Sequence, residues 1–268
     1  MKTLFVFLFC IISTLSFSKL CTPSQEGSII LPKTTKIGIL SAFPEPYGMF
    51  YQNRIIHIKN KKQTSLFPES PKVLFNTNEL ILGKLKTNLM KNFPKHQIVN
   101  LGTVDPSVHL TGYFIEGIWG PEAKGIHLKN APALINKNDL DVLVVIVPTT
   151  YHIPKLKKEG TGFGLFYLDN KATYVYASYA IKVYKKSDIK PISSNKQVLI
   201  DSIKIPKQPD LKQKKYPQET IFAFKIWINN TFMPKISKQI NCLLQKPYVA
   251  CTDEFSTPKK PFGYYLPH

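Results

Sequence analysis

The sequence predicts an α+β protein: a mixed β-sheet covered by helices on one side, with a long C-terminal amphipathic helix, an extended N-terminal arm and a C-terminal tail. Three observations predict this class. The continuously apolar, β-branched run at 141–149 indicates a central strand covered on both faces. Aromatic and β-branched residues at 164–185, with a turn at 169–171, favour a hairpin of long strands. Between 221 and 243 apolar residues recur with a period near 3.6, which is typical of a long amphipathic helix.

The region before the central strand alternates short strands with one helix. A turn at 44–48 separates two strands. Apolar residues at helical spacing predict a helix that begins at Thr77 or Asn78 and ends before Pro94, and a short strand follows. Asp105 before Pro106 is typical of a helix start.

The same patterns of apolar residues predict a strand and a helix after the hairpin. A strand in "NKQVLIDSIKIPK" is expected to pair with "SYAIKVYKK" across the loop "SDIKPISSN". The long helix follows, and Pro234 should kink or divide it, because proline removes a helical hydrogen bond.

Domain organisation follows from the two ends of the chain. Residues 1–18 are predicted to be a signal peptide, because Lys2 precedes an apolar run that is too short to span a membrane. Residues 19–35 are predicted to be an extended arm, 36–246 a single α+β domain and 247–268 a tail rich in proline and aromatic residues. The protein is therefore expected to be exported, and to be periplasmic, outer-membrane-associated or extracellular.

Cysteines add two expectations. In an oxidising compartment Cys242 and Cys251 are candidates for a disulfide around "LLQKPYVA". Cys21 then has no second cysteine of the mature chain to pair with. Alternatively, Cys21 itself forms a disulfide that ties the arm to the C-terminal region. Direct lipidation of Cys10 or Cys21 is not expected, since no small residue precedes either of them.

The net charge of +19 comes almost entirely from lysine, and Arg54 is the one arginine. Planar, bidentate recognition of bases depends on arginine, so a sequence-specific nucleic-acid reader is not expected. A lysine-rich surface could attract anionic lipid headgroups or an envelope polymer. Alternatively, the composition simply favours lysine at solvated positions. No further stretch of the mature chain is long and apolar enough for a transmembrane helix.

Three glycines, Gly160, Gly162 and Gly164, raise the question of a phosphate-binding loop. Such a loop lies directly between a strand and a helix, whereas here a strand follows. We therefore expect these glycines to let the chain turn or kink as it enters an edge strand.

The sequence contains no metal or cofactor signature and no nucleophile motif, so it does not favour an enzyme. The remaining catalytic candidates are His109, Glu116 and His127, with Asp105, because a glycine-rich region could bring these acid–base groups together. An alternative function is therefore a secreted hydrolase or ligand-binding protein that uses the region 105–130.

The segments "DVLVVIVPT", "GTGFGLFYL" and "ATYVYASYAIKVY" carry a resemblance in element order, over residues 36–245, to small α+β domains of bacterial envelope proteins. These include the N-terminal domain of TolB and the curli secretion lipoprotein family, although the lipidated cysteine of the latter is absent here. The resemblance implies an exported, non-enzymatic structural or accessory component of a cell-envelope assembly such as a secretion complex. Such a protein would act through protein–protein contacts of its arm, lysine-rich surface and tail.

Overall fold

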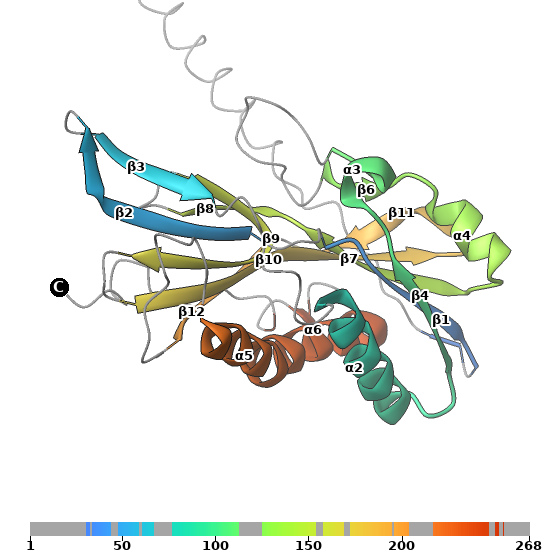
Figure 1. Ribbon diagram of the computed structural model, residues 1–268. Helices are drawn as coiled ribbons and strands as arrows, with labels where there is room; N and C mark the ends of the chain where they lie inside the picture. The colour runs from blue at the N-terminus through green and yellow to red at the C-terminus, as the bar shows by residue number, and fades with distance from the viewer. Residues whose placement is uncertain are drawn as a thin grey trace, which may run out of the picture.

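The longest strand of the sheet, β10 (Ala172–Lys185), organises the fold. The computed structural model describes residues 31–32, 34–43, 48–58, 61–66, 77–112, 125–153, 158–168, 172–194, 196–203, 217–246, 250–251 and 254. Within this part of the chain, ten strands form one mixed sheet whose main path runs β3-β2-β9-β10-β7-β1-β4. Figure 1 shows this sheet with its helices. The strands are β1 (Lys36–Ser41), β2 (Gly48–Ile58), β3 (Lys61–Leu66), β4 (Gln97–Thr103), β7 (Val142–Pro148), β8 (Thr150–Ile153), β9 (Lys158–Leu168), β10, β11 (Asp188–Ser193) and β12 (Gln197–Ile203).

β10 joins two half-sheets. Its first half pairs with β9 on one side and with β12 on the other. Its second half pairs with β7 and β11. β9 and β7 therefore lie end to end along one edge of β10. Thr149, directly after β7, links the two: its N–H donates to the carbonyl of Ser178 on β10, and its carbonyl accepts from the N–H of Gly162 on β9.

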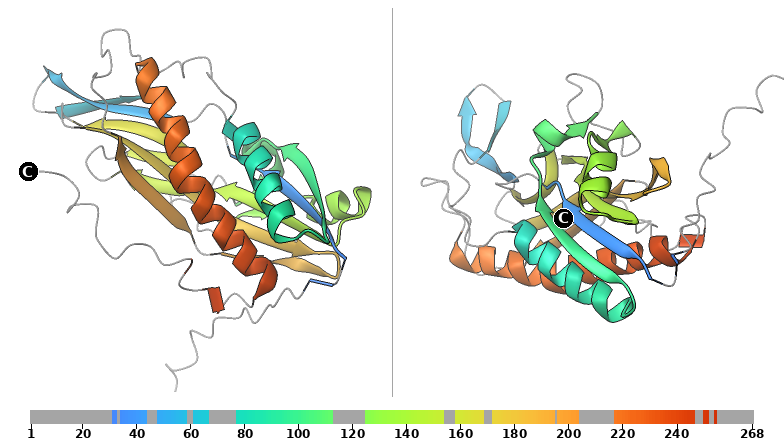
Figure 2. Two further views of the ribbon diagram at one scale, coloured as in Figure 1. Left: turned by 90° about the horizontal axis from the view of Figure 1, so that it is seen from below. Right: turned by 90° about the vertical axis from the view of Figure 1, so that its right-hand side faces the viewer.

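The helices lie in two layers. One layer holds α2 (Thr77–Asn92), α5 (Gln218–Trp227), the π-turn η2 (Ile228–Phe232) and α6 (Met233–Gln245). Figure 2 shows α5, η2 and α6 as one long rod that crosses the sheet beside α2. The other face carries α3 (Pro106–His109), α4 (Ala131–Lys137) and the small hairpin of β5 (Leu110–Thr111) and β6 (His127–Leu128), all near the β1–β4 edge. The predicted α+β class, with a mixed sheet and a long C-terminal helix, is confirmed, although helices lie on both faces of the sheet and not on one side as expected.

Each face has its own apolar core. β7 supplies both, because all seven of its residues are buried and alternate residues point to opposite faces. Val144 and Ile146 face the long helix, whereas Val145 and Val147 face α4. The sequence prediction of a central strand with both faces covered is therefore confirmed.

The long helix runs on through Pro234, where the sequence predicted a kink or a division. Pro234 is the second residue of α6, and the backbone N–H of Met233 before it donates to the carbonyl of Ile228, five residues earlier. The wider turn takes up the clash that a proline ring makes with the preceding helical turn. The aromatic ring of Phe232 points from this turn into the core, where it contacts Phe163 and Tyr179.

Three details of the sheet differ from the sequence prediction. The expected loop after β10 contains an additional strand, β11, which takes the place beside the second half of β10. β12 consequently pairs with the first half of β10 rather than with "SYAIKVYKK" as a whole. β9 is not an edge strand, because β2 pairs with it on the side opposite β10.

The two chain extensions lie largely outside the described residues. This holds for the predicted signal peptide 1–18, most of the arm 19–35 and most of the tail 247–268. Among the residues that the structure does describe, no helix is both long and apolar enough to cross a membrane.

Candidate functional site

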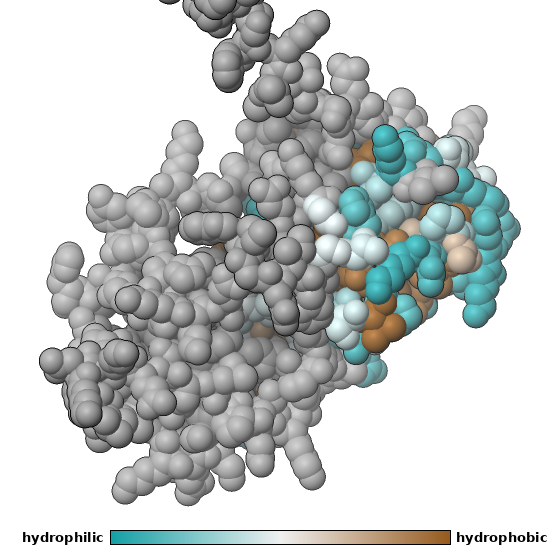
Figure 3. Space-filling model, turned by 90° about the horizontal axis from the view of Figure 1, so that it is seen from above, coloured by the Kyte–Doolittle hydropathy of each residue, from teal (hydrophilic) through white to brown (hydrophobic). Residues whose placement is uncertain are grey.

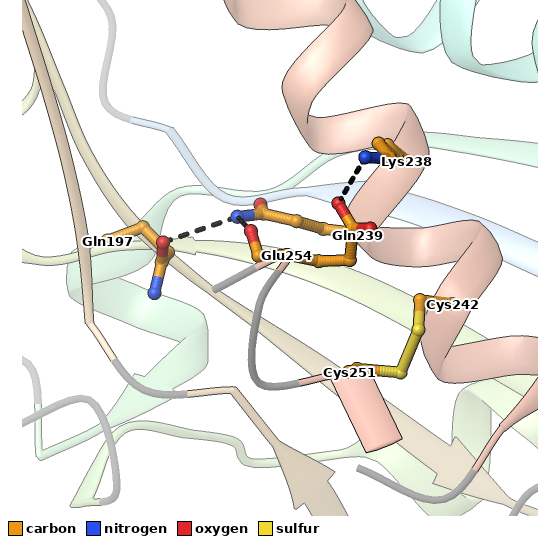
Figure 4. A network of polar contacts seen from close by, with 6 residues as sticks. All are labelled: Gln197, Lys238, Gln239, Cys242, Cys251 and Glu254. Carbon is orange, nitrogen blue, oxygen red and sulfur yellow. Dashed lines mark hydrogen bonds and ion pairs between the residues drawn. A yellow bond between two sulfur atoms is a disulfide. The ribbon is translucent and has the colours of Figure 1, made fainter. Parts of the chain in front are cut away.

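The C-terminal segment is fastened to α6 by a disulfide between Cys242 and Cys251, the pair that the sequence made a candidate. Cys242 lies on α6, and the two Cα atoms are 5.9 Å apart. Cys251 is completely buried among the core residues beneath the long helix. The segment that leads into the tail is therefore part of the core at this point (Figure 4).

A hydrogen-bond network centred on Gln239 reinforces this attachment. The Gln239 side chain on α6 is fully buried, and its Oε1 accepts a hydrogen bond from the Tyr179 hydroxyl at 2.8 Å. Its Nε2 donates to the backbone carbonyl of Glu254 at 2.9 Å and to Oε1 of Gln197 at 3.2 Å. One amide thus connects α6, β10, β12 and the C-terminal segment. Figure 4 shows its contacts with Gln197 and Glu254.

The raised pKa of Tyr179 and an ion pair of Glu254 are both consistent with this attachment of the C-terminal segment. Burial raises the pKa of Tyr179, so its hydroxyl stays protonated and donates. Outside the core, the ammonium group of Lys238 lies 3.0 Å from the carboxylate of Glu254. Exposed ion pairs of this kind contribute at most about 1 kcal/mol, so the disulfide and the buried amide carry most of the attachment.

The end of the N-terminal arm is also attached to the body of the protein. Leu31 packs against the core beneath the long helix. Thr35 donates its hydroxyl to the carbonyl of Pro32, and its own carbonyl accepts from the backbone N–H of Gln97 at the start of β4. The last residues of the arm and the first residues of the tail therefore pack against one apolar core.

The structure places two of the three catalytic candidates at the small β5–β6 pair. His109 ends α3 directly before β5, and its carbonyl accepts from the backbone N–H of Lys129 at 3.0 Å. His127 lies on β6 opposite Thr111, two residues out of register with His109. Glu116 lies outside the described residues.

Asp105 has a structural role. Its carboxylate caps α3 by accepting from the backbone N–H of Ser107 at 2.8 Å and from the Ser107 hydroxyl at 2.6 Å. These bonds hold the pKa of Asp105 below its usual value. The carboxylate thus does what is expected of a helix cap before proline.

A buried lysine beneath the hairpin escaped the sequence analysis. Lys182 on β10 is fully buried on the face opposite the long helix, and burial lowers its pKa to about 8. Burial, with a smaller contribution from the charge of Lys182, also lowers the pKa of His127. The strand pattern contained a signal for Lys182, since it alternates with Ala180 and Tyr184, which both point into the sheet core.

The glycines of β9 serve packing rather than phosphate binding. A Cβ atom at Gly160 or at Gly164 would lie 2.2 Å from the side chain of Tyr176 on β10. The ring of Tyr176 therefore lies directly on this glycine-lined stretch of strand. Gly162, between them, has a positive φ of 67°, which glycine adopts easily.

The cavities and metal-binding groups of the described residues are sparse. A pocket of about 60 Å³ lies between α4 and the end of β10, lined by Ile135, Tyr184 and Asp188 among others. Ligand pockets usually measure roughly 300–1,000 Å³. Within the described ranges, no three His, Cys, Asp or Glu side chains come together to hold a metal ion.

Comparisons with known proteins assign no family to this chain. No family model matches the sequence, and no curated protein matches it. Among solved structures, the chain is similar to a hypothetical protein from Chlamydia trachomatis, with 9% sequence identity and a TM-score of 0.34. That match covers 78% of this chain and 98% of the other.

Proposed function

We propose that this protein is an exported, non-enzymatic component of a bacterial cell-envelope assembly and that it acts through protein–protein contacts of its two chain extensions. The observation that carries the proposal is the attachment of the C-terminal segment to α6 by Cys251 and by the carbonyl of Glu254. Because its base is held in this way, the tail leaves the folded domain at a fixed position. Holding a peptide in this way lowers the entropy that it loses when it binds a partner.

The composition of the tail supports a contact role. After Glu254 the sequence continues "FSTPKKPFGYYLPH", in which aromatic residues and prolines surround two lysines. Tyrosine and phenylalanine are enriched at the centres of protein interfaces, and proline stiffens an extended peptide. Fourteen residues of this kind provide enough contact surface for a peptide-type interaction without a further folded domain.

The disulfide supports export. Disulfides persist in oxidising compartments such as the periplasm or the extracellular space and are rare in the cytosol of most organisms. The Cys242–Cys251 bond is therefore consistent with the signal peptide proposed at residues 1–18. We propose the periplasm or the periplasmic side of the outer membrane as the compartment.

The test is a crosslinked pull-down of the tagged protein from native envelopes, read by mass spectrometry. Three forms are compared: the full chain, a chain that ends at Glu254, and a chain in which residues 255–268 are scrambled. All three keep the disulfide and the Gln239 network. The proposal expects a fixed set of envelope proteins with the full chain only. Recovery of the same set with all three forms, or of no partner with any, would refute the role of the tail.

A further inference from the structure

The outer surface of the helical layer combines exposed apolar side chains with lysines. The exposed large apolar residues in the described part of the chain are Met90, Val108, Phe222 and Ile226. All of them except Val108 lie on α2 or α5. Phe222 and Ile226 are 64% and 43% exposed, and they lie one turn apart on α5.

The orientation of these side chains follows from the burial pattern. On α5 the buried residues are Thr220, Ile221, Phe224 and Trp227, which places Phe222 on the side directed away from the sheet. On α2 the buried residues include Ile81, Leu85 and Leu89, whereas Met90 and Lys91 are exposed on the outward side. Because both helices lie on the same face of the sheet, their outward sides form one broad surface (Figure 2).

The charge of this surface is strongly positive. Along α2, the helical rod and the attached Glu254, the exposed or half-buried charged residues are seven lysines and three glutamates. The lysines are Lys84, Lys86, Lys91, Lys225, Lys235, Lys238 and Lys246, and the glutamates are Glu79, Glu219 and Glu254. One of these carboxylates, that of Glu254, is already paired with Lys238.

The opposite face is different. Around α3, α4 and the adjoining end of β10, charges of both signs lie together, and Asp139 pairs with Lys186. The residues are Lys129, Lys137, Lys185, Lys186, Asp105, Asp139, Asp141 and Asp188. Val108 is the large apolar residue of the described part that is exposed there. Figure 3 looks onto this face and shows hydrophilic side chains with apolar ones between them over the described part. Net positive charge and several exposed apolar side chains therefore coincide on the helical layer, whereas charges of both signs surround Val108 on the opposite face.

We infer that the outer surface of α2, α5 and α6 docks on an anionic lipid surface. Lysines near a membrane gain energy from anionic headgroups, and exposed apolar side chains reach the boundary of the acyl chains. The broad surface presents the headgroups with lysines of α2, α5 and α6 together with Phe222, Ile226 and Met90. A lipid surface fits this distribution because it requires many dispersed positive charges and no matching pocket.

The test is sedimentation of the full protein, prepared in its exported form, with vesicles of phosphatidylglycerol and phosphatidylcholine in equal parts. Vesicles of phosphatidylcholine alone provide the uncharged comparison. The double variant Phe222→Ser/Ile226→Ser is expected to bind anionic vesicles about tenfold less than the wild type, or weaker still. Lys84→Gln/Lys91→Gln should lower binding about fivefold for each lysine removed.

Matched controls come from the opposite face. Val108→Ser removes an equally exposed apolar side chain, and Lys129→Gln/Lys137→Gln removes the same charge as the lysine variant. Both should bind like the wild type, and thermal unfolding checks that each variant is folded. Equal losses in the control and test variants, unchanged binding of the Phe222/Ile226 variant, or no binding to anionic vesicles would each overturn the inference.

This inference is independent of the proposed function. The vesicles contain no protein partner, and the variants leave residues 247–268 intact. Capture of an envelope protein through Phe222 without any vesicle binding would identify the surface as a protein interface, and it would overturn the lipid assignment.

Discussion

The Tyr179 hydroxyl donates a 2.8 Å hydrogen bond to Oε1 of Gln239, and both side chains are completely buried between the sheet and α6. The same amide binds the C-terminal segment through the carbonyl of Glu254. The centre of the sheet and the base of the tail are therefore linked through one side chain, so changes in the core should be detectable at the tail.

The first prediction concerns this link. Gln239→Leu leaves the Tyr179 hydroxyl and the Glu254 carbonyl without their partner, and an unsatisfied buried polar group costs about 1–3 kcal/mol. The free energy of unfolding should therefore fall by at least that amount. In a Tyr179→Phe background the same substitution should cost less, because one of the stranded groups is gone. Equal costs in both backgrounds, measured by denaturant unfolding, would show that the two residues are not coupled.

The second prediction concerns the disulfide. Cys242→Ala/Cys251→Ala removes a short covalent loop, which lowers the free energy of unfolding by about 2–3 kcal/mol in the chain-entropy model. The segment at 250–254 should also become sensitive to protease, because the remaining attachment is the Gln239 network. Limited proteolysis with mass spectrometry measures this. Cys21→Ala is the control, and it should leave both stability and cleavage unchanged.

The third prediction concerns the glycines of β9. Gly164→Ala places a methyl group 2.2 Å from the Tyr176 ring and should destabilise the fold by about 1–3 kcal/mol. Gly83→Ala on α2 meets no atom within 4 Å and should stabilise the protein by about 1 kcal/mol, because alanine is the better helix former. Thermal unfolding compares the two variants. If Gly164→Ala is neutral, the close contact with Tyr176 is not what requires glycine there.

The fourth prediction concerns Lys182. Its pKa is about 8 in the folded protein and about 10.5 when exposed, so between these values the unfolded chain binds more protons. The contribution of Lys182 to the free energy of unfolding therefore rises as the pH increases from 8 to 10.5. Lys182→Met should be more stable than the wild type at pH 7, by roughly 3 kcal/mol at most. This advantage should shrink as the pH approaches 10.

Denaturant unfolding at pH 7, 8, 9 and 9.5 checks the pH dependence. Lys137→Met, on the exposed side of α4, is the control, and its stability should run parallel to that of the wild type. A constant difference between Lys182→Met and the wild type over this range would contradict the lowered pKa of Lys182.

Local patterns in the sequence predicted the helices and the central strands well. The start of α2 at Thr77 and the apolar run at 142–148 depend on neighbouring residues, and each lies where it was expected. At Pro234 the helix continues through the π-helical turn η2 instead of breaking. The strand β12 was predicted in its segment, but its pairing was wrong and β11 was expected to be a loop, because strand pairing depends on residues that are distant in the sequence.

The candidate site was less predictable for the same reason. The Cys242–Cys251 pair could be proposed from spacing and compartment, but Gln239 is an ordinary polar residue in the helical pattern. Its importance comes from three partners on β10, β12 and the C-terminal segment, which only the fold brings together. The histidine candidates were predicted as a group, and the described residues place His109 and His127 on one hairpin.

The most direct test of the central claim is photo-crosslinking from a defined tail position in native envelopes. A photoreactive residue replaces Tyr264 in the tail, and in a second sample it replaces Asn136 on the exposed side of α4. The account predicts a discrete adduct with an envelope protein from position 264 and none from 136. No adduct from position 264, or the same adduct from both positions, would contradict a role for the tail in assembly.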